Sequence, residues 1–327
     1  MTAVKCACTR DMLREDWLKT RTCGIGGSDA AKIFGLVPYP DSTPYALWLE
    51  KTGQVPLKEK ESEAAYFGQV LESVVANEFE NRSEEIYGKK ITLRRSNYMW
   101  QLPEMPWMLA NVDRVVVGDA KAGFEAKTAN AFMADEWSGD NVPDAYYVQC
   151  QHYMAVMDWQ VVYIACLLGG QKFITKPVLR DDEFISAMIE RERTFWNDNV
   201  LKRVAPPMTA ADDPTLYYPE QTSPDLIPAT SEAQNLAREY SEVKKTLKIL
   251  GDQEAMLKNE LTMLIGEHAG IEGVCTWKQN KSGLKTDWKG LAIELGAATE
   301  QIEKYTTEKP GARVLRLISA QRQKGVA

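Results

Sequence analysis

Residues 113–127, DRVVVGDAKAGFEAK, are the stretch on which the predicted fold depends. With the residues just before it, this stretch predicts two short strands, 107–117 and 124–128. The glycine-rich segment 118–123 between the strands is typical of a turn. A β-hairpin is therefore expected at this point of the chain.

Three charged side chains are expected to meet at the end of this hairpin. Successive side chains of a strand point to opposite faces, so Glu125 and Lys127 project from one face and Asp113 can lie beside them. A hydrophobic core does not tolerate such charges unpaired. A divalent metal would balance them: hard oxygen ligands suit Mg²⁺ or Mn²⁺, and the lysine could orient or help deprotonate a water. The alternative is a simple ion pair between Glu125 and Lys127 on a surface hairpin.

The composition is that of an ordinary soluble protein, with 44% hydrophobic and 26% charged residues among 327. This length allows a full core and a second unit. No run approaches about 18 apolar residues and the N-terminus carries no apolar segment, so we expect a cytoplasmic protein that does not enter a membrane. The six cysteines form no CxxC pair and are expected to be reduced. Two histidines supply too few groups for a Ser-His-Asp hydrolase or a His-rich zinc site.

A glycine-rich segment near the N-terminus, RTCGIGGSDAAKIFG at residues 21–35, places Ser28 before a short helical run. Ser28 is the expected N-cap of that helix. On one interpretation capping is its only role. On the other, the Ser28 hydroxyl, the Arg21 guanidinium and the free N–H groups of the helix form a site for a phosphate.

A long helix is expected over residues 61–87, and it carries a glutamate close to its apolar face. Glu72 lies on the same side as Gly68, Val75 and Phe79, so its carboxylate needs a partner. The alternative is that the carboxylate stays in solvent at the edge of that face.

Another helix is expected from about residue 143, followed by strands 161–168 and 172–178 and a helix over 182–201. Gln149 and Tyr153 are four residues apart, so they share one face of the first of these helices. The order of helices and strands favours an α/β core.

Two sets of these residues resemble known families. Asp113 with Glu125-Ala126-Lys127 is similar to the Asp…Glu-x-Lys signature of the PD-(D/E)XK nucleases. The N-terminal part resembles the opening of the YqaJ-type viral recombinase family, to which lambda exonuclease is similar. The matching residues are Arg21, Gly24-Ile25-Gly26-Gly27-Ser28-Asp29-Ala30, Pro44-Tyr45, Trp48 and Lys51-Thr52-Gly53. The family's usual Ser-Pro-Tyr is Val37-Pro38-Tyr39 in this chain, and the resemblance spans roughly residues 10–200.

The resemblance implies an α/β (α+β) fold, with a PD-(D/E)XK restriction-endonuclease-like core in which helices flank a central mixed sheet. We expect this core at residues 1–205 and a proline-rich linker at 206–229. Residues 230–327 are expected to form a helical, basic C-terminal extension with small β elements.

The resemblance also implies an activity and the residues that carry it. The expected enzyme is a Mg²⁺-dependent 5′-to-3′ exonuclease on linear double-stranded DNA. In such an enzyme Mg²⁺, or Mn²⁺ in its place, is held by Asp113, Glu125, Glu72 and the Ala126 carbonyl, and Lys127 acts on the attacking water. Arg21 and Ser28 hold the 5′-phosphate of the DNA end, while Gln149 and Tyr153 place the DNA.

The implied partners are double-stranded DNA ends and a single-strand annealing protein, which takes up the 3′ overhangs. Family members that degrade DNA processively form rings, so a ring, most simply a trimer, is expected for a bacterial or phage-encoded protein. Two alternatives remain open. One is a structure-specific or sequence-specific endonuclease, and the other is a non-catalytic DNA-binding assembly protein.

The C-terminal extension combines a heptad pattern with an excess of basic residues. Apolar residues recur at alternating spacings of four and three from Leu236 to Leu264, interrupted by Glu254. Such a seam needs a partner, which is either another segment of the chain or another subunit. Residues 274–327 hold ten basic and five acidic side chains and so carry +5, whereas the whole chain carries −7. This asymmetry indicates either a nucleic-acid contact or a solvated basic face.

Overall fold

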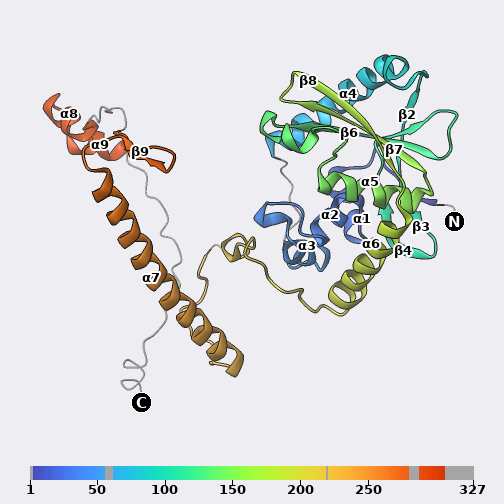
Figure 1. Cartoon of the computed structure of the whole chain (residues 1–327). Coiled ribbons are helices and arrows are strands. Elements are labelled where there is room, and N and C mark those ends of the chain that lie inside the picture. The colour runs from blue at the N-terminus through green and yellow to red at the C-terminus, as the bar shows by residue number, and fades with distance from the viewer. Residues whose placement is uncertain (1–2, 56–61, 219, 280–286, 306–327) are drawn as a thin grey trace. The chain divides into compact units, whose positions relative to one another are not determined.

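A computed structural model describes residues 3–55, 62–218, 220–279 and 287–305 (Figure 1). The chain divides into two compact units, Met1–Tyr217 and Tyr218–Ala327. The boundary falls inside the segment predicted as a linker.

A five-stranded mixed sheet forms the centre of the first unit, in the order β2-β5-β6-β7-β8. Its strands are β2 (Leu93–Arg95), β5 (Arg114–Val116), β6 (Ala122–Ala129), β7 (Val161–Leu168) and β8 (Lys172–Leu179). Only β6 and β7 are parallel, and helix α5 (Asp144–Met157) makes the crossover that a parallel pair requires. The hairpin between β7 and β8 turns at Gly169 and Gly170, whose φ angles of 60° and 70° suit glycine. The predicted mixed sheet of an α/β core is confirmed.

A second, three-stranded antiparallel sheet has the order β1-β3-β4. It consists of β1 (Val4–Cys8), β3 (Tyr98–Leu102) and β4 (Met105–Ala110). The prediction of one strand over residues 107–117 is therefore wrong, because the chain leaves this sheet at Ala110 and enters the five-stranded sheet at Arg114. Val112, in the middle of the crossing, is buried like the strand residues around it, so the apolar pattern continues through the break.

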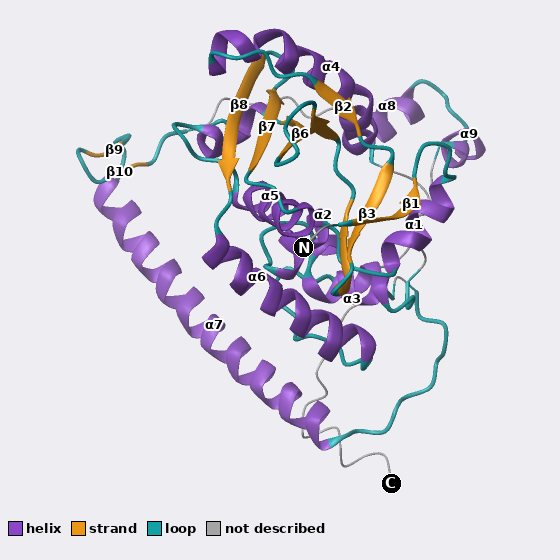
Figure 2. Cartoon of the chain, turned by 90° about the vertical axis from the view of Figure 1, so that its right-hand side faces the viewer, coloured by secondary structure: helices purple, strands orange, loops and turns teal. Residues whose placement is uncertain are grey.

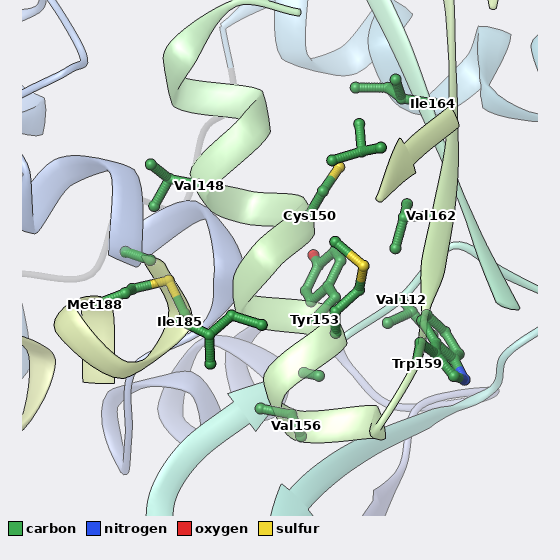
Figure 3. Packing of buried hydrophobic residues seen from close by; sticks show 14 of the residues in the cluster. Val112, Val148, Cys150, Tyr153, Val156, Trp159, Val162, Ile164, Ile185 and Met188 are labelled. Atoms are coloured by element: carbon green, nitrogen blue, oxygen red, sulfur yellow. The ribbon is translucent and has the colours of Figure 1, made fainter. Parts of the chain in front are cut away.

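Helices cover both faces of the five-stranded sheet, as Figure 2 shows for α4 (Glu63–Tyr87) and α5. On the α4 side, Phe79 packs its ring 4.8 Å from that of Phe124 and 5.6 Å from that of Tyr163. On the α5 side, Val162 and Ile164 of β7 pack against the helix (Figure 3). Because the side chains of β7 alternate between these two clusters, this strand is buried on both faces.

Helix α6 (Asp182–Thr194) packs against α5 through Ile185 and Met188 (Figure 3) and continues as a π-helical turn, Phe195–Leu201. Three shorter helices precede α4: α1 (Arg14–Thr22), α2 (Gly27–Ile33) and α3 (Pro44–Lys51). Short 3₁₀ turns lie at Pro40–Ser42, Ala131–Met133, Asp135–Trp137 and Pro214–Leu216. The helices predicted from about residues 61, 143 and 182 are all present.

The prediction that Ser28 caps α2 is wrong. The N-cap is Gly26, whose extended backbone donates its N–H to the Asp29 carboxylate at 3.0 Å. Ser28 lies in the first turn of the helix with its hydroxyl exposed. The helix starts two residues earlier than expected because Asp29, not Ser28, satisfies the N-terminal backbone donor.

The first part of the predicted linker packs on the first unit. Thr43 donates its hydroxyl hydrogen to the Asp212 carboxylate, and the Tyr217 ring lies 6.0 Å from that of Tyr45. The proline-rich stretch is thus attached to the first unit as far as Tyr217 through these side chains.

The second unit contains one long helix and several small elements: α7 (Ser231–Ile265), β9 (Gly270–Ile271), β10 (Cys275–Thr276), α8 (Trp288–Glu294) and α9 (Thr299–Lys304). Most of the predicted basic side chains lie outside the described residues. All six cysteines are free thiols, as predicted. No helix in the described ranges is long and apolar enough to cross a membrane.

Candidate active site

Glu125 and Lys127 lie side by side on β6, the central strand of the five-stranded sheet, and face α5. Lys127 Nζ donates to Glu125 Oε1 at 2.7 Å. Glu125 is only 3% exposed, so this pair is not the surface ion pair considered as an alternative. A buried pair at the end of a strand is costly to maintain without a function or further partners.

Asp113 reaches the same position from the residue before β5. Its Oδ2 accepts a hydrogen bond of 2.9 Å from the Ala126 N–H, between Glu125 and Lys127. Burial raises the pKa of the Asp113 carboxyl well above its usual value, and the nearby charges of Glu125 and Glu72 raise it further. The structure therefore brings the three residues of the Asp…Glu-x-Lys pattern together, with an excess of negative charge.

Two side chains of α5 fix the geometry of this group. Gln149 Oε1 accepts from Lys127 Nζ at 2.9 Å, and its Nε2 donates to Glu125 Oε1 at 2.7 Å and to the Tyr153 oxygen at 3.0 Å. The Tyr153 hydroxyl donates to the Asn111 carbonyl at 3.0 Å, in the segment that joins the two sheets. Gln149 and Tyr153, on one face of α5, thus hold both the Glu125–Lys127 pair and the chain segment that leads to Asp113.

Glu72, on α4, pairs with Arg114 rather than with the other acids. The same Arg114 Nη1 donates to the Asp113 carbonyl at 2.9 Å. One turn before Glu72, a Cβ added to Gly68 would lie 3.6 Å from Thr128 Oγ1, so α4 runs close to the end of β6. Glu72 consequently acts on Asp113 through its charge.

The carboxylates carry more negative charge than the neighbouring lysine and arginine balance, so they suit an added metal cation. Three acids, Asp113, Glu125 and Glu72, face two cations, Lys127 and Arg114. Glu125 Oε2 is buried and has no hydrogen-bond partner. Within the described ranges no group of three or more Asp, Glu, His or Cys side chains is arranged to hold a metal, and Glu72 contacts Arg114. The donor set therefore fits a hard divalent cation at Asp113 and Glu125, and Glu72 would join it only by leaving Arg114.

Lys127 is held as a cation. Burial by itself lowers the pKa of its ammonium, but the charges of Glu125 and Asp113 outweigh burial and raise the pKa above the ordinary value. The Nζ atom also lies 4.9 Å from the centre of the Tyr146 ring. In this arrangement Lys127 is a hydrogen-bond donor and a positive charge rather than a base.

A second polar cluster surrounds Arg21, at the end of α1. Arg21 Nη2 donates to Ser28 Oγ at 3.0 Å and to Asp29 Oδ1 at 2.9 Å. Lys51 Nζ, which is fully buried, donates to Asp29 Oδ2 and to the Arg21 carbonyl, each at 2.7 Å. Two cations thus share one buried carboxylate, which leaves an excess of positive charge. The partly exposed Arg21 presents this charge at the surface, beside the exposed Ser28 hydroxyl. This cluster suits an anion at the surface.

The two clusters are joined by the glycine segment before α2. A Cβ on Gly27 would lie 2.6 Å from Tyr153 Cε1, and one on Gly24 would lie 2.5 Å from the Trp107 carbonyl oxygen. Ile25 pairs with β4, donating its N–H to Trp107 at 2.6 Å and accepting the Leu109 N–H at 2.9 Å. Only glycines allow this close approach, which brings the start of α2 against Tyr153, the hydrogen-bond partner of Gln149.

Three charged residues of these clusters were not predicted as site residues: Asp29, Lys51 and Arg114. Asp29 gave a usable signal, because it is a carboxylate followed directly by the apolar residues Ala30, Ala31 and Ile33 in a short helix. Arg114 gave none beyond its place next to Asp113.

Replacing Asp29 with alanine is expected to destabilise the protein by about 3–5 kcal/mol, the usual cost of leaving a buried charge unpaired. Glu15→Ala is the control, because it removes an exposed ion pair with Lys19 and should change little. Both are measured by urea unfolding. Equal stabilities of the two variants would show that Asp29 does not compensate Lys51 and Arg21.

The difference in stability between wild type and Asp29→Ala is also expected to depend on pH. Burial raises the pKa of Asp29, but the charges of Lys51 and Arg21 outweigh it and hold the pKa below the usual value. The folded state therefore binds this proton less readily than the unfolded state. The contribution of Asp29 is full above its unfolded pKa and is lost as the pH falls, so the difference between wild type and Asp29→Ala should shrink in acid.

The first unit is an α/β protein core whose central strand, β6, carries Glu125 and Lys127, with Asp113 beside them just before β5. Residues 16–160 match the YqaJ-like viral recombinase domain. The chain is 39% identical over 305 residues to the uncharacterized protein YqaJ of Bacillus subtilis (strain 168), covering 90% of this chain and 92% of that protein. The chain belongs to the YqaJ-like viral recombinase family, and the resemblance drawn from the sequence is confirmed.

Solved structures give more distant matches. The alkaline exonuclease LHK-Exo from Laribacter hongkongensis is matched with a TM-score of 0.45 and 16% identity, over 58% of this chain and 94% of that one. A phage related exonuclease from Haemophilus somnus 129PT is matched with a TM-score of 0.41 and 17% identity, over 56% and 96% of the two chains.

Proposed function

We propose that this protein is a Mg²⁺-dependent exonuclease that degrades one strand of linear double-stranded DNA from its 5′ end and leaves 3′ overhangs. The observation that carries the proposal is the convergence of Asp113, Glu125 and Lys127 on one buried group, held by Gln149. A core packed only for stability has no use for these charges in one place.

The contacts of each residue in the group support a proposed role for it. Asp113 and Glu125 would hold Mg²⁺ or Mn²⁺, with the Ala126 carbonyl and Glu72 as further ligands. That ion, when bound, supplies Lewis-acid activation of the phosphodiester and of water. Lys127, held as a cation, donates hydrogen bonds to the attacking water and stabilises the negative charge that develops on the phosphate.

Arg21 and Ser28 would bind the terminal 5′-phosphate. Asp29 holds the Arg21 guanidinium in place, and Lys51 balances the negative charge of Asp29. The positive charge of Arg21 is therefore available to an anionic ligand. Tyr153 contacts Gly27, next to Ser28, and Gln149, which holds Lys127; these contacts support a substrate whose first phosphate and scissile phosphate are bound together. Gln149 and Tyr153 hold the groups on both sides in place.

The family description as a viral recombinase supports a role in recombination. A nuclease that leaves 3′ overhangs supplies the single strand that an annealing protein takes up, so an annealing protein is the proposed partner, in the cytoplasm of a bacterial cell. We further propose a ring of subunits, most simply a trimer. Light scattering at micromolar concentration that found a monomer with full processivity would contradict the ring.

The proposed function is tested by incubating linear and covalently closed circular duplex DNA with the protein, with and without Mg²⁺. We expect the linear DNA to be degraded to nucleotides only when Mg²⁺ is present, and the closed circle to stay intact. Cleavage of the closed circle would identify an endonuclease. Binding of linear DNA without any hydrolysis in Mg²⁺ or Mn²⁺ would identify a non-catalytic DNA-binding protein.

A further inference from the structure

Helix α7 exposes a continuous apolar stripe, here called the α7 seam. Its residues repeat at alternating spacings of four and three, which is the pattern of a coiled coil. They are between 41% and 75% exposed: Leu236, Tyr240, Val243, Leu247, Leu250, Leu257, Leu261 and Leu264. Within the described part of the second unit, no other helix or strand packs along this helix.

A helix of this kind requires a partner. Most of the stability of a helix in a protein comes from packing its apolar face, and α7 extends over 35 residues with only Ile265 buried. We propose that the α7 seam pairs in parallel with the α7 seam of a second copy of the chain, as a contact separate from those that would close the proposed ring.

The charges that flank the seam select this partner and orientation. In a parallel pair, residues that flank the seam meet residues five positions later on the other helix. Glu239 then meets Lys244 of a second copy, and Gln253 meets Lys258 of a second copy. No two like charges meet at these flanking positions.

Antiparallel pairing brings like charges together in the three registers that overlap most of the seam. With full overlap, Glu239 lies opposite Glu260 of a second copy. A shift by one heptad in either direction places Lys244 opposite Lys258 or opposite Lys244 of a second copy. Like-charge pairs are unfavourable, so the flanking residues favour parallel self-association.

Glu254 occupies a seam position and limits the strength of the association. In a parallel pair it faces the same residue of the second copy, so one like-charge pair lies in the seam itself and opposes the association that the flanking residues favour. A polar residue at one seam position also fixes the register at a cost in stability. Replacing it with leucine should therefore tighten self-association by at least about tenfold.

The test compares full-length variants by sedimentation velocity over a range of concentrations. The seam variant carries Leu250→Lys and Leu257→Lys, and the control carries Ile249→Lys and Met256→Lys. The control residues have the same spacing and are also exposed, at 60% and 56%, but lie off the seam. We expect wild type and control to share a concentration-dependent larger species, which the seam variant forms at least about a hundredfold more weakly. Circular dichroism checks that helix content is unchanged.

Orientation is tested by charge exchange. Glu239→Lys should weaken the association about three- to tenfold, and Glu239→Lys with Lys244→Glu should restore it. Tighter association of Glu239→Lys would instead indicate an antiparallel pair. Equal sedimentation of the seam variant and the control, with no tightening by Glu254→Leu, would overturn the proposal and leave another segment or another protein as the partner. Hydrolysis of a short duplex, measured beside these, should be unchanged in the seam variant, so the outcome is independent of the proposed nuclease activity.

Discussion

Lys127→Ala is expected to lower the rate of phosphodiester hydrolysis by at least about a hundredfold, the usual effect of removing one preorganised electrostatic group. Lys127 Nζ is held by Glu125 Oε1 at 2.7 Å and by Gln149 Oε1 at 2.9 Å, so its position is set before any DNA binds. Alanine removes both the charge and the donor. Binding of DNA ends should change little, because this group acts on the water and the developing charge.

The rate is measured on a 5′-phosphorylated linear duplex at saturating Mg²⁺, and end binding is measured separately in Ca²⁺. Lys121→Ala is the control, since Lys121 lies in the turn before β6 and its half-exposed ammonium donates to Asp158, away from Lys127 and Glu125. It should retain normal hydrolysis. Asp113→Ala and Glu125→Ala should behave like Lys127→Ala. Near-normal turnover of Lys127→Ala would remove this cluster from the chemistry.

A 5′-phosphorylated duplex is expected to be degraded about ten- to a hundredfold faster than the same duplex with 5′-hydroxyl ends. Losing one hydrogen-bond partner of a charged group typically costs about 1.5–3 kcal/mol, which corresponds to this range. A terminal phosphate carries more negative charge than an internal diester, so a site that holds Arg21 and Ser28 at its surface should distinguish the two.

Arg21→Ala should remove most of this preference while the protein still cuts DNA. Asp29 keeps its contact with Lys51 in this variant, so its charge does not become unpaired. Lys19→Ala is the control on the same helix, because Lys19 is exposed and pairs only with Glu15. Equal rates of the unaltered protein on both kinds of end would show that Arg21 and Ser28 only stabilise a turn.

The local parts of the fold and site follow from the sequence. The side chains of β6 alternate whatever surrounds the strand, which is why Glu125 and Lys127 could be placed on one face in advance. The helical spacing of Gln149 and Tyr153 is equally local, and both side chains contact the same group in the structure. The predicted strands 161–168 and 172–178 likewise left only a short gap, where the structure turns at Gly169 and Gly170.

The contacts between distant segments could not be predicted from local pattern. Glu72 and Arg114 are 42 positions apart, and Asp29 and Lys51 are 22 apart. The change from one sheet to the other before Asp113 left no trace in the apolar pattern, because Val112 is buried in the observed crossing just as it would be in a single strand. In each case the sequence predicts that a charge needs a partner, but only the packing of helices on the sheet decides which partner it receives.

The most direct test of the account follows which end of a strand is lost first. One sample of a 5′-phosphorylated linear duplex is labelled at the 5′ ends and another at the 3′ ends, and both are incubated with the protein in Mg²⁺. The account predicts that the 5′ label is released first, as mononucleotide, while the 3′ label stays on a shortening strand, and that Lys127→Ala releases neither. Release of the 3′ label first, or of labelled internal fragments, would contradict it.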